Sequence, residues 1–249
     1  ARDAYLIRRS AEHLSRIVQT QRNAARRGKA IPRAVELPFG FDDQPGSLPT
    51  LRLHTPNGRL IHLRGYIDRV DLAELGDELL GIVVDYKWTP NKRLDLSRAY
   101  HGLSLQLLAY LLVLAECGKT LAGRPIRPIA GLYVSLTPTY QLVPHPSLAS
   151  DEMAASQGVF RPRGLIRSED MTSLDTELGE GKRSEIYAIA QKKDGGLSDV
   201  DRSDGADSNA FNALLTHTKH TLGRLADGIL DCDVSVNPYR LGTFSPCSW

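Results

Sequence analysis

The chain has 249 residues, of which 41% are hydrophobic and 24% charged, and its formal net charge is +2. This composition is typical of a globular domain, and no apolar run approaches the roughly 18 residues of a membrane span, which argues against a membrane partner. Three cysteines make no disulfide framework in a chain of this size and indicate a reducing, cytoplasmic setting. We expect one domain over residues 1–249, with a core at 33–140 and a C-terminal extension at 141–249. Because the chain lacks a signal sequence and an initial methionine, we expect it to be part of a longer protein.

The first predicted element is a helix over residues 4–27, which Gly28 ends. Its apolar residues recur at helical spacing in a single stripe, formed by Ile7, Ala11, Leu14, Ile17 and Val18. Residues 1–33 also hold nine arginines and lysines against two acidic residues. A basic helix of this kind can bind nucleic acid phosphates, or its charges can form the solvated face of an amphipathic helix. Charge alone favours the second interpretation.

Short strands and turns are predicted next. They are strands at 34–39, 51–54 and 59–70, a loop at 40–49, and turns at 55–58 and 74–78. Within the strand at 59–70, Asp68 shares a face with residues that need not be part of a core.

The following strand, residues 79–88, begins with the apolar run Leu79–Val84, which indicates burial on both faces. It ends in Asp85-Tyr86-Lys87. Because strand side chains alternate, Asp85 and Lys87 point to one side and Tyr86 to the other. Charges at the end of a core strand are costly unless a metal ion or an anionic substrate is bound there.

A long helix is predicted over residues 98–117, with Asp95 or Ser97 as its cap and Gly118 at its end. A glycine inside a helix costs roughly 1 kcal/mol relative to alanine and marks a close approach of backbone or ligand. Four residues at intervals of four share one face of this helix: Arg98, Gly102, Gln106 and Tyr110.

The rest of the chain contributes less regular structure. We predict a strand at 128–136, a loop at 145–183, a short strand at 186–190, a polar surface loop at 192–207, a helix from Asp207 or Ser208 to Ile229, and an irregular tail from 237. Strands followed by a long helix and a further strand predict a mixed central β-sheet flanked by helices, an α/β fold.

Asp68 and Asp85 would converge from adjacent strands and form an oxygen-ligand site for a hard cation such as Mg²⁺. A metal ion there would acidify a bound water, orient it against phosphorus and neutralise the leaving oxygen. Lys87 would either stabilise the developing charge as an ammonium or accept a proton from the water. The competing interpretation is an ion pair of Asp85 with Lys87 at the surface, with Asp68 paired to Arg69 or Arg64. These residues alone support both interpretations about equally.

Two further features bear on that choice. Glu180-Gly-Lys182 repeats the acid–x–lysine pattern without a preceding strand, and we interpret it as solvated surface. Gln106 can donate a hydrogen bond to a phosphate oxygen, and Tyr110 can donate one or stack on a base, which favours the metal site. In isolation these two residues are equally well explained as part of a leucine-rich helix.

Four stretches, in this order, resemble the PD-(D/E)xK nuclease superfamily. They are Gly65-Tyr-Ile-Asp-Arg-Val-Asp71, Val83-Val-Asp-Tyr-Lys87, Leu94-Asp-Leu-Ser97 and Tyr100-His-Gly-Leu-Ser-Leu-Gln-Leu-Leu-Ala-Tyr-Leu111. Their order, spacing and flanks resemble the C-terminal nuclease domain of the B subunit in the AddAB (RexAB) helicase–nuclease. The resemblance covers residues 33–112 and extends, more weakly, through the tail at 237–247.

The resemblance implies roles for individual residues. Asp68 and Asp85 correspond to the metal-binding acids, the Tyr86 main-chain carbonyl to a further ligand, and Lys87 to the catalytic lysine. Gln106 and Tyr110 correspond to a motif that supports the active site and contacts DNA. Arg98, on the same predicted helix face, is a further candidate for DNA binding.

The implied activity is exonucleolytic hydrolysis of single-stranded DNA that requires Mg²⁺, for which Mn²⁺ can substitute. In the whole enzyme a helicase motor unwinds the DNA, and the A subunit of the helicase–nuclease is the partner, in the bacterial cytoplasm. The implied role is the processing of double-strand-break ends for recombinational repair.

Three departures from the family pattern stand out. Trp88 follows the lysine, where the family has a small polar residue, so this side chain either stacks or packs. No upstream helix with a matching metal ligand is recognisable, and His13 is not assigned that role. The resemblance implies a 4Fe-4S cluster in the parent protein, with Cys247 at the first tail position, but Cys117 and Cys232 do not have ligand spacing. We therefore expect no cluster within this chain.

Two other functional interpretations remain. The chain could be a non-catalytic DNA-binding or assembly module with the same fold, which the basic segment 1–33 favours. It could also be another enzyme of the superfamily, such as a stand-alone RecB-like or CRISPR-associated exonuclease. The length of the parent chain would separate that enzyme from the helicase–nuclease type.

Overall fold

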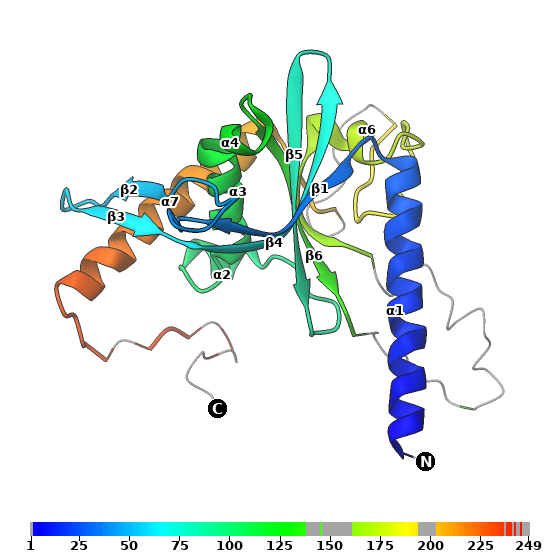
Figure 1. The fold of residues 1–249 in the computed structure, drawn as a ribbon, viewed down its shortest axis with the longest axis horizontal. Coiled ribbons are helices and arrows are strands. Elements are labelled where there is room, and N and C mark those ends of the chain that lie inside the picture. Colours follow the sequence, from blue (N-terminus) through cyan, green and yellow to red (C-terminus); the bar gives the residue numbers. More distant parts are fainter. Residues whose placement is uncertain are drawn as a thin grey trace.

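The computed structural model describes residues 2–137, 145, 161–193, 203–236, 238–240, 242 and 245. It contains a mixed six-stranded β-sheet flanked by helices, which confirms the predicted fold class (Figure 1). The strands are β1 (Ile31–Phe39), β2 (Leu51–His54), β3 (Leu60–Leu63), β4 (Gly65–Leu75), β5 (Glu78–Lys87), β6 (Arg127–Ser135), β7 (Arg163–Arg167) and β8 (Gly205–Ala206). The helices are α1 (Arg2–Arg27), α2 (Leu96–Tyr100), α3 (Gln106–Cys117), α4 (Lys119–Ala122), α6 (Met171–Leu174) and α7 (Ser208–Leu230), with a 3-10 turn at Ser168–Asp170. Over these described ranges, no helix combines the length and the apolar character that crossing a membrane requires.

The large sheet has the strand order β1-β4-β5-β6-β7-β8, and β2 and β3 form a separate two-stranded sheet. β4 is antiparallel to both β1 and β5. A tight turn at Gly76-Asp77 joins β4 to β5, with Gly76 in the left-handed region at φ 57°. β5 and β6 run parallel, because α2, α3 and α4 form the crossover between them.

β5 is buried on both faces, as predicted, and its alternate residues belong to two separate hydrophobic clusters. Val83 faces the cluster that includes the leucines of α3 and Phe211 of α7. Ile82 and Val84 face the cluster that includes Ile17 of α1. Figure 1 shows α3 and α7 on one side of β5 and α1 on the other. The side chains of Asp85 and Lys87 therefore fall on the α3 side of the strand.

α1 forms as predicted, but most of its apolar stripe is not buried. Ile17 is 5% exposed, whereas Ile7 is 71% exposed. The N-terminal part of the helix extends beyond the sheet (Figure 1). The C-terminal end is anchored, since Arg27 Nε donates to Oδ1 of the fully buried Asp175 at 3.1 Å.

The predicted single helix over 98–117 is wrong, because the structure divides it into α2 and α3. Gly102 follows the end of α2 and has φ 84°, in the left-handed region that favours glycine. A Cβ atom on Gly102 would lie 3.2 Å from Thr221 Cγ2 of α7. The glycine does mark a close approach, as predicted, but at a break between two helices.

Other boundaries also differ from the predictions. The strand predicted over 59–70 divides at Arg64 into β3 and β4, and β4 continues to Leu75. The predicted loop over 145–183 contains β7, the 3-10 turn and α6 within its described part. The segment 186–190 is a bend that an isolated bridge between Arg183 and Ala190 closes, and it is not a strand. Two residues of the predicted polar loop form β8, while α7 begins at its predicted cap, Asp207, whose side chain accepts from Ala210 N–H.

Gly81 in β5 has no room for a side chain. A Cβ atom there would lie 2.5 Å from Ile126 Cγ2 and 2.6 Å from Leu114 Cδ2. We expect Gly81→Ala to lower the free energy of unfolding by about 1–3 kcal/mol through overpacking. The matched control is Gly228→Ala in α7, where a Cβ atom meets nothing within 4 Å. That change should raise stability by up to about 1 kcal/mol through helix propensity. Urea unfolding of both variants checks the prediction, and equal effects of the same sign would contradict it.

Candidate active site

The site is built at the end of β5, where the buried strand gives way to polar residues. Asp85 is 1% exposed, and Lys87 Nζ lies 2.7 Å from Asp85 Oδ2. The two groups form a close ion pair, and no other donor in the described part of the chain reaches either carboxylate oxygen of Asp85. The two side chains share one side of the strand, as the alternation predicts. Asp85 is therefore a buried carboxylate, and the interpretation of a simple surface ion pair does not describe it.

Asp68 lies beside this pair from the neighbouring strand β4. Its Oδ2 accepts a hydrogen bond from the main-chain N–H of Tyr86 at 2.7 Å. The ladder between β4 and β5 ends at Arg69 and Val84, so Asp68 occupies the position where the two strands separate. This geometry confirms that the two acids come from adjacent strands. Asp68 pairs with the backbone of β5 there, and Arg69 pairs with Asp71 instead.

A chain of hydrogen bonds links Lys87 to α3. Lys87 Nζ donates to Gln106 Oε1 at 2.9 Å, and Gln106 Nε2 donates to the Tyr110 hydroxyl at 2.9 Å. Gln106 and Tyr110 can do this because they stand at i and i+4 on one helix face. The Tyr110 ring is further held by an edge-on contact with the buried Phe39, at 6.1 Å between centroids. The structure thus brings together Asp68, Asp85, Lys87, Gln106 and Tyr110.

The electrostatics follow from burial and from the two neighbouring acids. Burial raises the pKa of the Asp85 carboxyl above its usual value, the positive charges of Lys87 and Lys92 oppose this shift, and the negative charge of Asp68 adds to it. Burial also raises the pKa of the Tyr110 phenol, as do the charges of Asp85 and Asp68. The pKa shifts of both groups thus come first from burial, and the charges of the neighbouring acids add to them.

The donor set fits a divalent cation. Two carboxylates, one of them buried with Lys87 as its only close donor among the described residues, are the ligands that Mg²⁺ or Mn²⁺ takes when substrate and water complete the shell. Among the residues that the structure describes, no group of three or more His, Cys, Asp and Glu side chains comes together as a metal site. The described part of the chain thus offers a two-carboxylate site and no closed cage of protein ligands.

The remaining predicted site residues lie elsewhere or stay predictions. Arg98 is on α2, where its guanidinium lies 3.4 Å from Asp95, and the helix break removes it from the face that Gln106 occupies. The Tyr86 carbonyl stays a predicted ligand. Cys247 lies outside the described residues, while Cys117 is buried and Cys232 exposed, both as free thiols.

Sequence reasoning missed the contribution of β6. In the parallel ladder, Tyr133 lies beside Asp85 and Ser135 beside Lys87. Tyr133 is 2% exposed, and its ring centroid lies 6.0 Å from Lys87 Nζ and 5.4 Å from Lys92 Nζ. The signal that could have found it is the polar pair, Tyr133 and Ser135, at period two near the end of an otherwise apolar strand. The register of β6 against β5 could not be predicted from the sequence.

The side chains on the opposite side of β5 form hydrogen bonds that hold the fold together. Tyr86 points away from Asp85, and its hydroxyl accepts from Arg69 Nη1 at 3.1 Å. Arg69 also donates to both oxygens of the buried Asp71 and to Gln21 Oε1 of α1. The triplet Glu180-Gly-Lys182 lies on the surface with both charged side chains exposed, which confirms its predicted environment.

A mixed sheet whose central antiparallel pair ends in two acids and a lysine, with a helix supplying a supporting Gln and Tyr, defines a nuclease fold. The PD-(D/E)XK nuclease superfamily matches residues 1–249, and the chain belongs to this superfamily. It is 32% identical to the B subunit of the ATP-dependent helicase/deoxyribonuclease from Geobacillus kaustophilus, over 98% of this chain and 21% of that protein. The proteins of the same name from Bacillus pumilus and Bacillus licheniformis are 32% and 36% identical, over 99% and 88% of this chain and 21% and 18% of theirs. The chain thus spans about a fifth of the length of these relatives.

Proposed function

We propose that the chain is a metal-dependent exonuclease domain that hydrolyses phosphodiester bonds in single-stranded DNA. The observation that carries this proposal is the buried Asp85 carboxylate, which has Lys87 as its only close donor among the described residues and Asp68 on the adjacent strand. The relatives are named as one subunit of a helicase/deoxyribonuclease, which supports a DNA substrate and a partner protein. We further propose that the parent protein processes double-strand-break ends for recombinational repair in the bacterial cytoplasm.

The contacts of each site residue support a separate role in the proposed reaction. Asp68 and Asp85 would hold the cation, and Tyr86 N–H fixes the Asp68 carboxylate by its hydrogen bond to Oδ2. A divalent cation bound there would neutralise charge at the phosphate and lower the pKa of a bound water.

Lys87 is held as a hydrogen-bond donor, which supports its role as an ammonium. One of its protons goes to Gln106 Oε1, and its nitrogen contacts Asp85, so a third proton remains for a phosphate oxygen. Charge that develops on the phosphoryl oxygens is then stabilised by a group whose position is already fixed. Gln106 is a positioning residue, and Tyr110 in turn fixes the orientation of its amide by accepting from Nε2.

The test is cleavage of 5′-labelled single-stranded DNA with Mg²⁺, with Mn²⁺ and with a chelator. We expect cleavage only with metal, and a loss of about 10³-fold in Asp68→Ala because a cation ligand is removed. The matched control is Glu180→Ala, in the exposed triplet that has the same spacing, and it should keep full activity. Cleavage in the chelator, or an active Asp68→Ala protein, would rule the proposal out.

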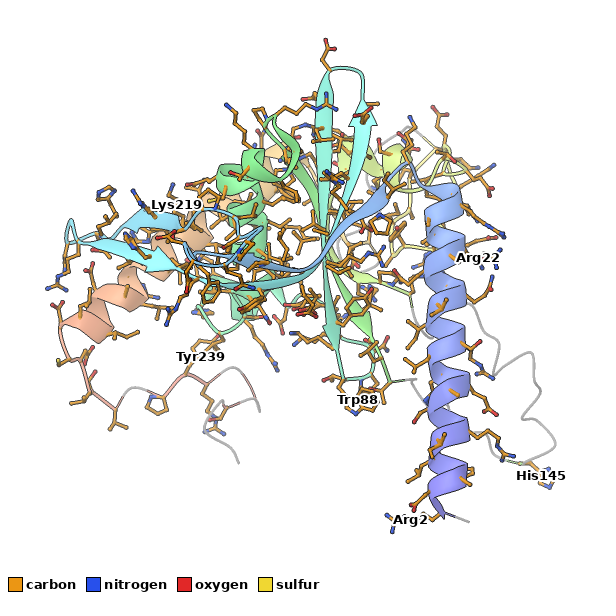
Figure 2. All side chains as sticks on the ribbon, in the orientation of Figure 1. Arg2, Arg22, Trp88, His145, Lys219 and Tyr239 are labelled. Atoms are coloured by element: carbon orange, nitrogen blue, oxygen red, sulfur yellow. The ribbon has the colours of Figure 1, made fainter. Side chains whose placement is uncertain are left out.

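A non-catalytic DNA-binding module is the second candidate, and α1 favours it. This helix carries exposed basic side chains, among them Arg2 and Arg22 (Figure 2), and its N-terminal part extends beyond the sheet. Titration calorimetry separates the two candidates. If Mg²⁺ or Mn²⁺ binding releases or absorbs heat and Asp68→Ala abolishes this signal, the result supports the nuclease. If the protein binds DNA in a salt-sensitive way but binds neither metal, the result supports the DNA-binding module.

A further inference from the structure

Trp88 stands at the end of β5, one residue beyond Lys87, with its side chain in solvent. It is 75% exposed, and it lies where the strand leaves the sheet (Figure 2). The alternative that this residue packs against the core is therefore wrong. One exposed aromatic side chain is ordinary on a protein surface, so its exposure alone assigns no role. A role for Trp88 is indicated by the loop that carries it.

The loop that carries Trp88, residues 88–93, is held at both ends against β6. Leu136 N–H donates to the Lys87 carbonyl at 2.8 Å, and Lys92 N–H donates to the buried Ser135 Oγ at 2.9 Å. Between these bonds, Pro90 restricts its own φ, and Asn91 takes the left-handed conformation at φ 53°, which asparagine tolerates well. The loop is a defined turn, so Trp88 is presented to solvent at little further cost in conformational entropy.

The same loop brings positive charge to the site. Lys92 Nζ lies over the ring of Tyr133, the ring that Lys87 Nζ also approaches, so both ammonium groups lie near the Asp85 carboxylate. From Lys87 to Leu94 the chain has three basic residues, the third being Arg93, and no acidic one. An exposed indole and a fixed ammonium therefore lie in one short loop next to the catalytic lysine.

We propose that the 88–93 loop is a subsite for an unpaired nucleotide, in which a base stacks on Trp88 and an adjoining phosphate binds Lys92. This inference rests on the proposed nuclease function and adds the reason for a single-stranded substrate. Aromatic side chains beside cationic groups are the means by which proteins hold single strands without reading their sequence. In a duplex both faces of an internal base are already stacked, so Trp88 selects a strand whose bases are free.

Tryptophan fluorescence tests the stacking contact without any turnover. The chain has two tryptophans, Trp88 and Trp249, so Trp249→Phe leaves Trp88 as the only one. In a chelator, an oligothymidylate of about 12 nucleotides should quench this fluorescence saturably, and a blunt duplex of the same length should not. Binding of the labelled oligothymidylate, measured by anisotropy, without any quenching would overturn the inference.

Steady-state cleavage of single-stranded DNA tests the contribution to binding. Trp88→Ala should raise KM about 5- to 100-fold with kcat unchanged, because stacking acts before the chemical step. Trp88→Phe should restore most of the loss. Leu230→Ala, at a half-exposed apolar residue at the end of α7, is the control and should change neither constant. An unchanged KM in Trp88→Ala would overturn the subsite and leave the nuclease proposal standing.

Salt dependence tests the phosphate contact. Lys92→Gln should lower the slope of log affinity against log salt for oligothymidylate by about 0.7, the value for one phosphate contact on a single strand. Lys182→Gln, in the exposed surface triplet, should leave the slope as it is. Equal slopes for wild type and Lys92→Gln would remove Lys92 from the subsite. A failure of the proposed nuclease function would show in a different measurement, as cleavage that does not need metal.

Discussion

Asp85→Asn is expected to abolish cleavage and to make the protein more stable at neutral pH. The carboxylate is 1% exposed, and burial outweighs the ion pair with Lys87 in the balance that raises its pKa, so its charge is held in the folded state at a cost. Asparagine keeps the shape and removes the charge. We expect activity to fall by about 10³-fold or more, because a cation ligand is lost. We expect the free energy of unfolding to rise by about 1 kcal/mol, the size of gain that relief of a destabilising functional group gives.

The pKa shift of Asp85 determines how the gain in stability from Asp85→Asn depends on pH. Burial raises the pKa of Asp85 in the folded state, so folding favours its protonated form. The stability that this protonation provides is fully present below the unfolded pKa of about 4 and is lost as pH rises through the folded pKa. The gain from Asp85→Asn should therefore be small near pH 3.5 and grow toward neutral pH.

Urea unfolding at several pH values, without divalent metal, measures this. Glu180→Gln is the control, because Glu180 is exposed and should show no such trend. An Asp85→Asn protein that is less stable than wild type at pH 7 would show that the ion pair with Lys87 outweighs the cost of burial.

Arg69→Ala is expected to have the largest effect on stability. Arg69 donates to both oxygens of Asp71, with Nε to Oδ1 at 2.6 Å, and Asp71 is buried. Removing the arginine leaves an uncompensated buried carboxylate, which costs about 3–5 kcal/mol. In a domain of this size, that loss lowers Tm by roughly 6–20 °C, which calorimetry measures.

The control for this prediction is an exposed pair that also involves β4. Arg124 Nη2 lies 2.7 Å from Glu74 Oε1, and the two side chains are 38% and 78% exposed. Arg124→Ala should cost less than about 1 kcal/mol. The double variant Arg69→Met/Asp71→Leu should recover much of the stability that the single variant loses, since no buried charge is left unpaired. If the double variant is as unstable as Arg69→Ala, packing of the arginine stem, and not its charge, explains the loss.

The sequence allowed us to predict which candidate site residues lie beside one another where the repeat of a strand or a helix determines it. Alternation along a strand places Asp85 beside Lys87, and helical spacing places Gln106 beside Tyr110. Asp68 could be added because it comes from the preceding arm of the same hairpin. Each of these inferences spans few residues, and the structure confirms the contacts.

The features that the sequence did not predict depend on partners far along the chain. The helix break at Gly102 reflects packing against Thr221, which lies more than a hundred residues later. The position of β7 in the sheet depends on Asp204, whose carboxylate accepts from Arg163 and from Gly164 N–H. Tyr133 joins the site only through the register between β5 and β6. Local propensity carries no information on such contacts.

The hydrogen bonds around Tyr86 connect α1 to the end of β5 that carries the candidate site. Gln21 of α1 accepts from Arg69, and Arg69 donates to the hydroxyl of Tyr86. Tyr86 stands between Asp85 and Lys87 in the chain, and its own N–H holds Asp68. Gln21 is thus two hydrogen bonds away from the residue whose N–H holds Asp68, although α1 lies on the opposite face of the sheet from Asp85. The long basic helix and the two candidate cation ligands therefore share one continuous network of contacts across the sheet.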